Sequence, residues 1–78
     1  MDLNEGRVVK NRLREVRRKE GRTVAWLAER IGTSPTNIYN LEQGRYRGSL
    51  ETWLKIADAL GVTIDALTEG MLEPAGKA

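Results

Sequence analysis

Apolar residues recur three or four positions apart through most of this chain, which is the spacing of one face of an α-helix. This pattern, with the capping residues beside it, predicts five helices. Their ranges are about 6–20, 24–30, about 35–43, 50–60 and 64 to about 68. No segment alternates apolar and polar residues in the manner of a half-buried strand. The pattern therefore predicts a compact all-α domain with short connections.

The third predicted helix has the narrowest apolar face. Ser34 is expected to cap its first turn, Pro35 suits its first position, and Gly44 is expected to end it. Only Ile38 and Leu41 within it are apolar. The wider face carries uncharged hydrogen-bonding side chains, which are Thr36, Asn37, Tyr39, Asn40 and Gln43. Such a face suits a helix that reads base edges in a DNA major groove, and a solvated surface helix is the alternative.

The second predicted helix ends very close to the third. Thr23 is its expected N-cap, and only Gly32-Thr33-Ser34 separates the two helices. So short a gap requires a sharp turn rather than a long antiparallel connection. Ala28 and Gly32 are small residues near the join, so they allow the helices to approach closely. These features predict a helix-turn-helix.

The other helices supply most of the expected core. In the first, Val9, Leu13 and Val16 form the apolar stripe, and Gly21 is expected to end the helix. The fourth follows the N-cap Ser49 and has a wide apolar face, so it is expected to be mostly buried. The residues of that face are Leu50, Trp53, Leu54, Ile56, Ala57 and Leu60.

Basic residues gather in the first half of the chain. Residues 1–47 hold 11 Lys and Arg against 6 Asp and Glu, whereas residues 48–78 hold 2 against 5. Several of the basic residues surround the first predicted helix, and Arg45 and Arg47 lie in a short loop with Tyr46 between them. A basic surface of this kind suits DNA phosphates, and a solvated polar surface is the alternative.

Composition excludes several function classes. The chain has 78 residues, enough for one small domain, with no Cys and no His. No disulfide, no thiolate or imidazole metal site and no histidine base is therefore available. We expect neither an enzyme nor a cofactor. Because no apolar run approaches the length of a membrane span, a cytoplasmic location is expected.

These motifs together resemble the helix-turn-helix domain of the Cro and lambda-repressor type, the XRE family. The resemblance covers residues 11–70. Its motifs are Leu13-Arg14-Glu15-Val16-Arg17, Leu27-Ala28-Glu29-Arg30-Ile31-Gly32, Ile38-x-x-Leu41-Glu42-x-Gly44 and Ser49-Leu50-Glu51-Thr52-x-Leu54-Lys55-Ile56-Ala57-x-Ala59-Leu60-Gly61-Val62. It implies a five-helix lambda-repressor-like domain over residues 6–70, between an arm of residues 1–5 and a tail of residues 71–78.

The resemblance, read with the side-chain chemistry, assigns roles to individual positions. Base contacts are expected from Thr36, Asn37, Tyr39 and Asn40. Asn40 is the favoured reader, because an amide can bridge N6 and N7 of adenine. Phosphate contacts are expected from Arg14, Thr23, Val24, Ser34, Pro35, Gln43, Arg45, Tyr46 and Arg47. Arg17 and Glu42 are expected to form a structural ion pair.

Three positions depart from the pattern of the family. Val24 stands where a glutamine is common, so only its backbone N–H is expected to reach a phosphate. Arg22 replaces a usual apolar residue, and Trp26 replaces a usual polar one. We interpret Trp26 as a partly exposed packing residue, with a partner surface as the alternative.

The resemblance also implies an assembly and a regulatory role. The expected function is that of a transcriptional regulator, a repressor, which binds double-stranded DNA as a homodimer on a palindromic operator. The candidate dimer interface is Ile64, Leu67, Met71 and Leu72, unless Ile64 and Leu67 only complete the monomer core. No sensing or self-cleaving segment is recognised, so regulation is expected through protein concentration or a regulatory protein partner. The alternative is an interaction adaptor or an antitoxin component with the same fold.

Overall fold

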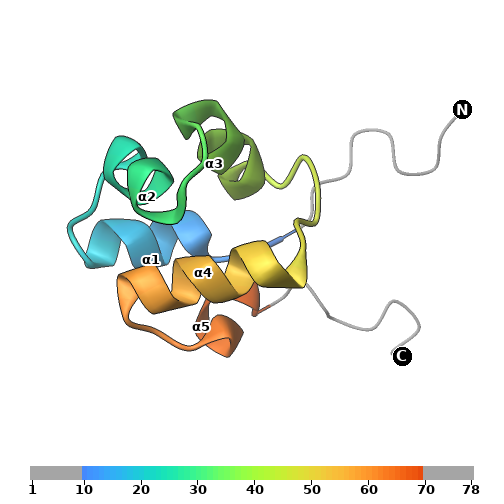
Figure 1. Ribbon diagram of the computed structural model, residues 1–78. Helices are drawn as coiled ribbons and strands as arrows, with labels where there is room; N and C mark the ends of the chain where they lie inside the picture. Colours follow the sequence, from blue (N-terminus) through green and yellow to red (C-terminus); the bar gives the residue numbers. More distant parts are fainter. Residues whose placement is uncertain (1–9, 70–78) are drawn as a thin grey trace, which may run out of the picture.

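A computed structural model describes residues 10–69 and confirms the all-α architecture. Its helices are α1 (Leu13–Lys19), α2 (Val24–Ile31), α3 (Pro35–Glu42), α4 (Leu50–Leu60) and α5 (Ile64–Thr68). Figure 1 shows α2 and α3 on one side of the domain and α5 on the other, with α4 between them. The predicted bounds of α4 and α5 are confirmed, and those of α2 and α3 differ by one residue at their C-terminal ends.

The last four helices begin at hydroxyl N-caps, and the caps of α2, α3 and α4 are the predicted ones. In each case the Ser or Thr oxygen accepts the backbone N–H of the residue three positions later, at 2.9–3.2 Å. These caps are Thr23, Ser34, Ser49 and Thr63. A cap of this kind satisfies an otherwise unpaired N–H and stabilises the helix by about 1 kcal/mol. The ends of these short helices are therefore set by local sequence.

All five helices contribute to one core. Its largest fully buried side chains are Leu13, Leu27, Ile38, Leu41, Ile56 and Leu67. Trp53 is also buried, and its ring N–H donates to the carbonyl oxygen of Arg47 at 2.7 Å. This bond ties the loop after α3 to α4. Burial on this scale is the main favourable contribution to the folding of a small domain.

The prediction for the start of the first helix is wrong. The helix begins at Leu13 rather than near residue 6, and residues 10–12 are not helical. Asn11 is used in other ways, because its Oδ1 accepts from the N–H of Leu13 and its Nδ2 donates to the carbonyl of Leu41. The N–H of Arg12 donates to the carbonyl of Leu67 at 2.7 Å. Val9, the arm of residues 1–5 and the tail of residues 71–78 lie outside the described residues.

The prediction of a wide buried face on α4 is also wrong. Leu50 is 67% exposed and Leu54 is 52% exposed. The buried stripe of the helix is Trp53, Ile56, Ala57 and Leu60. Leu50 and Leu54 are one turn apart, so they form a second stripe that faces away from the core. The structure thus leaves two leucines on the surface.

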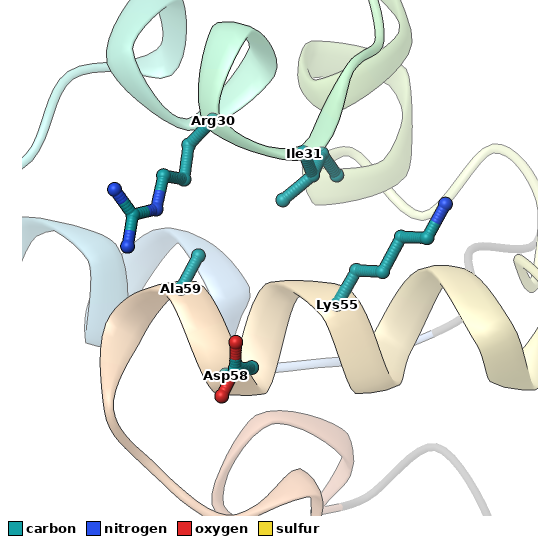
Figure 2. Close-up of a pocket in the computed structure, with 5 residues that line it drawn as sticks. All are labelled: Arg30, Ile31, Lys55, Asp58 and Ala59. Atoms are coloured by element: carbon teal, nitrogen blue, oxygen red, sulfur yellow. The ribbon is translucent and has the colours of Figure 1, made fainter.

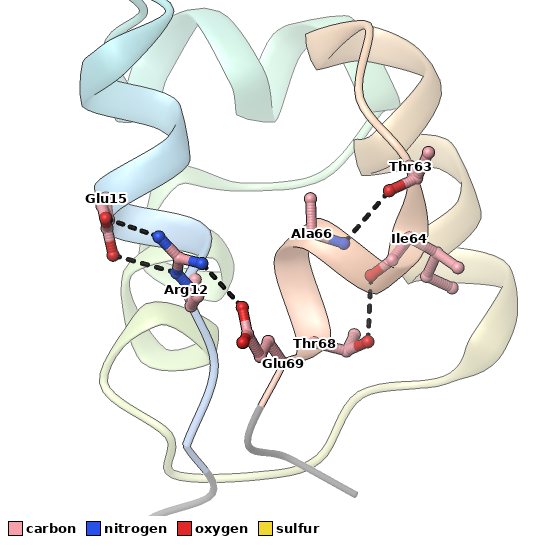
Figure 3. A network of polar contacts seen from close by, with 7 residues as sticks. All are labelled: Arg12, Glu15, Thr63, Ile64, Ala66, Thr68 and Glu69. Atoms are coloured by element: carbon pink, nitrogen blue, oxygen red, sulfur yellow. Dashed lines mark hydrogen bonds and ion pairs between the residues drawn. The ribbon is translucent and has the colours of Figure 1, made fainter.

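Arg12 connects α1 with the end of α5 (Figure 3). Its Nη1 is 2.7 Å from Oε1 of Glu69, and its Nη2 is 2.7 Å from Oε2 of Glu15. The hydrogen bond from Arg12 lowers the pKa of Glu15 below its usual value. The same pairing, first with Glu15 and then with Glu69, raises the pKa of Arg12 above its usual value. This exposed network joins the two ends of the described chain.

Candidate nucleic-acid interface

α2 and α3 form the helix-turn-helix that the sequence predicts. The N–H of Thr33 donates to the carbonyl of Ala28 at 2.8 Å, which closes the end of α2. Gly32, with φ of +81°, then turns the chain sharply, and Ser34 caps α3. Figure 1 shows α3 emerging from this turn at an angle to α2, along one edge of the domain. The turn therefore presents one face of α3 to solvent.

The orientation of α3 follows from its two apolar residues. Ile38 and Leu41 are both 0% exposed, so they anchor the helix on the core. Thr36 and Tyr39 are exposed, and Asn37 and Asn40 are half-buried at the edge of the same surface. The four predicted base-contacting residues thus lie on the outer side of α3. Donors and acceptors of this kind match the polar edges of base pairs.

Both the nitrogen and the oxygen of the Asn37 side-chain amide are hydrogen-bonded within the protein. Its Nδ2 donates to the hydroxyl of Thr33 at 2.8 Å, and its Oδ1 accepts from the hydroxyl of Tyr46. The same hydroxyl also lies 3.1 Å from the carbonyl oxygen of Asn37. Tyr46 belongs to the loop that follows α3, so this contact docks the loop against the first turn of the helix.

Arg45 lies against the middle of α3. Its Nη1 donates to Oδ1 of Asn40, and its guanidinium carbon is 5.8 Å from the centre of the Tyr39 ring. The structure therefore brings Tyr39, Asn40 and Arg45 together. The sequence places Arg45 in the basic loop but does not predict these contacts, because they depend on the path of that loop.

The predicted phosphate-contacting residues are spread around this surface. Pro35, Arg45, Tyr46 and Arg47 are exposed, and Gln43 is half-buried at the end of α3. Arg14 is exposed on α1, beside a shallow hollow that Glu42 of α3 also lines.

Two of the phosphate candidates, Thr23 and Ser34, act first as helix caps, and a third, Val24, is the first residue of α2. The oxygens of Thr23 and Ser34 accept N–H groups, which leaves their hydroxyl hydrogens as donors. The Val24 side chain packs against the core, so only its backbone N–H is suited to a phosphate.

The ion pair that the resemblance implies is present. Nε of Arg17 is 2.5 Å from Oε2 of Glu42, and Nη2 is 3.2 Å from Oε1. The two side chains are only 10% and 2% exposed. Arg17 also donates to the carbonyl of Arg22 at 2.8 Å. This buried bidentate pair holds the end of α3 on α1 and the turn before α2.

Most of the chain matches one known protein family. Residues 11–69 match the helix-turn-helix domain family. The chain belongs to that family. The match covers α1 to α5, so it includes the turn between α2 and α3 and the exposed face of α3.

Named relatives of this helix-turn-helix domain are regulators of transcription. The transcriptional repressor RstR of the cryptic phage CTXphi in Vibrio cholerae is 39% identical over 59 residues, which are 76% of this chain and 53% of RstR. The chain therefore matches about half the length of that repressor. An uncharacterized HTH-type transcriptional regulator from Methanothermobacter thermautotrophicus is 47% identical over 49 residues, which are 63% of this chain and 71% of that protein.

A solved structure supports the same fold. The restriction-modification controller protein C.AhdI from Aeromonas hydrophila has 33% sequence identity and a TM-score of 0.67, over 70% of this chain and 83% of C.AhdI. The protein therefore has the all-α, lambda-repressor-like fold of XRE-type helix-turn-helix DNA-binding proteins. Proteins of this family are not enzymes.

Trp26 of α2 lies between two arginine side chains. The guanidinium carbon of Arg22 is 4.2 Å from the centre of the Trp26 ring, and that of Arg30 is 5.9 Å away. Trp26 is half-buried and also packs against the core. These contacts agree with the interpretation of Trp26 as a packing residue. Arg22 and Trp26, two of the residues that depart from the family pattern, are thus in contact with each other.

A shallow hollow of about 260 Å³ lies between α2 and α4. Figure 2 shows Arg30 and Ile31 of α2 facing Lys55, Asp58 and Ala59 of α4 across it. Within residues 10–69 of the helix-turn-helix domain, no group of acidic residues is arranged to hold a metal ion. The same residues contain no helix that is long and apolar enough to span a membrane.

Proposed function

We propose that this protein is a sequence-specific repressor that reads an operator in the DNA major groove with α3. The observation that carries the proposal is the exposed, uncharged polar face of α3, anchored by the fully buried Ile38 and Leu41. Such a helix can approach base edges without burying a charge. Its site of action is the DNA of the cytoplasm.

The basic residues around α3 have a different proposed role. Arg47 in the loop after α3 and Arg14 on α1 are exposed cations outside α3. The hydroxyl hydrogens of the N-caps Thr23 and Ser34 supply further donors. We assign these groups to phosphates, which fix the register of the helix on the duplex without reading sequence.

We further propose that two copies bind one palindromic operator. To read two half-sites, the α3 helices of such a dimer must lie about 34 Å apart, which is one turn of DNA. Leu67 is 0% exposed and belongs to the monomer core, so we leave it out of the proposed interface. Ile64 is half-buried, and Met71 and Leu72 lie outside the described residues.

The exposed stripe of α4, Leu50 and Leu54, is the surface that we propose a second copy of the chain covers. Leu50 and Leu54 form an apolar patch, and Glu51 and Lys55 lie beside it, with Nζ of Lys55 3.5 Å from Oε2 of Glu51. A two-fold contact requires a self-complementary patch. Leucines flanked by both signs of charge meet that requirement, because each acidic group can face a basic group of the other copy.

The proposed function is tested by selecting sites from random duplex DNA with the purified protein. The enriched site is then titrated against unrelated DNA at two salt concentrations. A palindromic consensus bound about a thousandfold tighter than unrelated DNA is expected. Weak, strongly salt-dependent binding without a consensus would contradict the proposal, because it indicates contacts to phosphates alone.

A further inference from the structure

Arg45 is drawn from its loop onto the outer face of α3. Its Nη1 bonds to Oδ1 of Asn40, and its backbone N–H donates to the carbonyl of Asn40 at 3.1 Å. On the other side its guanidinium faces the ring of Tyr39 at 5.8 Å. Both partners belong to the surface proposed to enter the major groove. An arginine fixed there is placed for bases rather than for the phosphate backbone alone.

The loop is held in this position by a second contact. The hydroxyl of Tyr46 bonds to both oxygens of Asn37, the side-chain Oδ1 and the backbone carbonyl. The amide of Asn37 is also bonded to Thr33 through Nδ2. Asn37 is therefore a positioning residue, because both ends of its amide already bind groups of the protein. Its role is to keep Tyr46, and with it Arg45, against the helix.

The bond between Arg45 and Asn40 determines which way the Asn40 amide points. A guanidinium group carries only donors. Asn40 must therefore turn its oxygen toward Arg45 and its NH2 group away. The two side chains together offer DNA the NH2 group of Asn40 and the remaining N–H groups of Arg45. All of these groups are donors.

We propose that Asn40 and Arg45 act as a joint donor pair that reads guanine in each half-site. Guanine presents two acceptors in the major groove, N7 and O6, whereas adenine presents the acceptor N7 and the donor N6. The pair therefore matches guanine at both positions. This inference rests on the proposed function and differs from the adenine contact that Asn40 alone would favour.

Adenine is disfavoured electrostatically rather than by a lack of lone pairs. Oδ1 of Asn40 keeps a second lone pair after it accepts from Arg45. An adenine N6 group that reached this oxygen would bring its hydrogens beside the cationic guanidinium. Guanine O6 at the same place is attracted by that charge. The difference favours guanine over adenine by about tenfold or more, the range of one good bidentate contact.

The test repeats the selection with three variants, Arg45→Ala, Asn40→Ala and Arg47→Ala. The wild type should enrich guanine at one symmetric position of each half-site. Arg45→Ala should reduce the guanine-to-adenine ratio there by about tenfold or more while the rest of the consensus stays. Arg47, exposed in the same loop, is the matched control: Arg47→Ala should weaken all sites alike and keep the guanine.

A base-analogue measurement tests the same contact without changing the protein. Replacing that guanine by 7-deazaguanine removes N7, so wild-type affinity should fall about fivefold or more. Hypoxanthine keeps N7 and O6 and lacks only the minor-groove amino group, so it should bind like guanine.

Two results would overturn the donor pair and leave the repressor function intact. One is a wild-type consensus with adenine, rather than guanine, at the position that Asn40→Ala relaxes. The other is an Arg45→Ala variant that binds every sequence more weakly with an unchanged consensus, as expected of a phosphate contact. If the wild type enriches no consensus at all, the proposed function itself fails, and this inference fails with it.

Discussion

At the residue scale, Arg17 and Glu42 are the two charges that the fold cannot easily lose. Both side chains are buried, and two hydrogen bonds join them. Arg17 also holds the carbonyl of Arg22. A buried charge without its partner is strongly unfavourable, even though the intact pair contributes little net stability. The pair therefore acts by fixing where α3 ends relative to α1.

Replacing either member alone should destabilise the domain severely. Arg17→Ala or Glu42→Ala is expected to lower the free energy of unfolding by about 3–5 kcal/mol, because the remaining charge stays buried. Urea denaturation followed by the fluorescence of Trp53 and Trp26 measures this loss. The control is Arg18→Ala, an exposed arginine on the same helix, with an expected effect below about 0.5 kcal/mol. Equal effects of Arg17→Ala and Arg18→Ala would contradict a structural role for the pair.

Gly48 occupies a position where both backbone and space exclude a side chain. Its φ is +81°, and an added Cβ would lie 2.9 Å from Cδ1 of Leu41 and 2.9 Å from Nε1 of Trp53. Gly21 has a similar φ of +73°, but an added Cβ there meets open space. A side chain at Gly21 would therefore meet backbone strain alone, whereas one at Gly48 would meet both backbone strain and steric overlap.

The Gly48→Ala variant should lose more stability than the Gly21→Ala variant. Gly21→Ala is expected to cost about 1–2 kcal/mol from the left-handed backbone alone. Gly48→Ala should cost about 1–3 kcal/mol more, because it overpacks the contact between the loop and Trp53. Thermal and urea unfolding of both variants measure the difference. The same loss in both would show that the contact to Leu41 and Trp53 relaxes without cost.

At the element scale, the residues that cap the helices made most helix ends predictable from the sequence. Ser49 and Gly61 flank α4, and its bounds follow from them. Local sequence was insufficient at the start of α1, because residues Asn11 and Arg12 bond to α3 and α5 rather than to a preceding turn. These long-range partners are visible only in the folded chain.

The sequence predicted which residues belong to the candidate site, but it did not predict the contacts between them. The polar residues of α3 were assigned from periodicity and family resemblance, and their outer position follows from the buried Ile38 and Leu41. The bonds from Tyr46 to Asn37 and from Arg45 to Asn40 depend on how the loop folds back. Likewise, periodicity could not decide which of two adjacent apolar stripes of α4 faces the core. That choice depends on the placement of α2 and α5.

The exposed stripe of α4 is expected to hold the dimer together. Leu54→Glu places a charge in the apolar patch with Leu50, so the variant should sediment as a monomer at micromolar concentrations where the wild type is a dimer. Lys19→Glu, on the exposed surface of α1, adds the same group elsewhere and should stay dimeric. If the wild type is monomeric with and without operator DNA, the dimer proposal is wrong.

At the scale of the whole molecule, the termini of the described chain are joined by an exposed charge network. Arg12, just before α1, bonds to Glu15 of α1 and to Glu69 after α5. Because the Arg12 hydrogen bond lowers the pKa of Glu15 in the folded state, the unfolded state takes up the proton first as the pH falls. The stabilisation is therefore fully present above the ordinary pKa of 4.5 and is lost as the pH falls through the folded value.

Acid titration of stability should reveal this coupling. The free energy of unfolding is expected to decline below pH 4.5 in the wild type, and less steeply in Arg12→Ala. High salt should reduce the difference between the two proteins, because the pair is exposed to solvent. Urea midpoints measured at several pH values provide the test. Parallel pH profiles for the two proteins would show that the pair does not contribute.

The two halves of the chain differ in net charge. The half of the chain that contains α1 to α3 carries most of the cations, and the half that contains α4 and α5 is slightly acidic. A basic side attracts DNA over long range, whereas the polar side chains of α3, with Arg45 against them, are proposed to distinguish one sequence from another. Affinity and specificity should therefore respond separately to mutation.

The most direct test of this account is the discrimination ratio of Asn40→Ala, its affinity for the selected operator divided by that for unrelated DNA. We predict that the variant loses about 1–3 kcal/mol on the operator and much less on unrelated DNA, so the ratio falls. Arg47→Ala should weaken both complexes about equally and reduce the salt dependence. If Asn40→Ala weakens both complexes alike, α3 does not read the operator through this residue, and the central claim is contradicted.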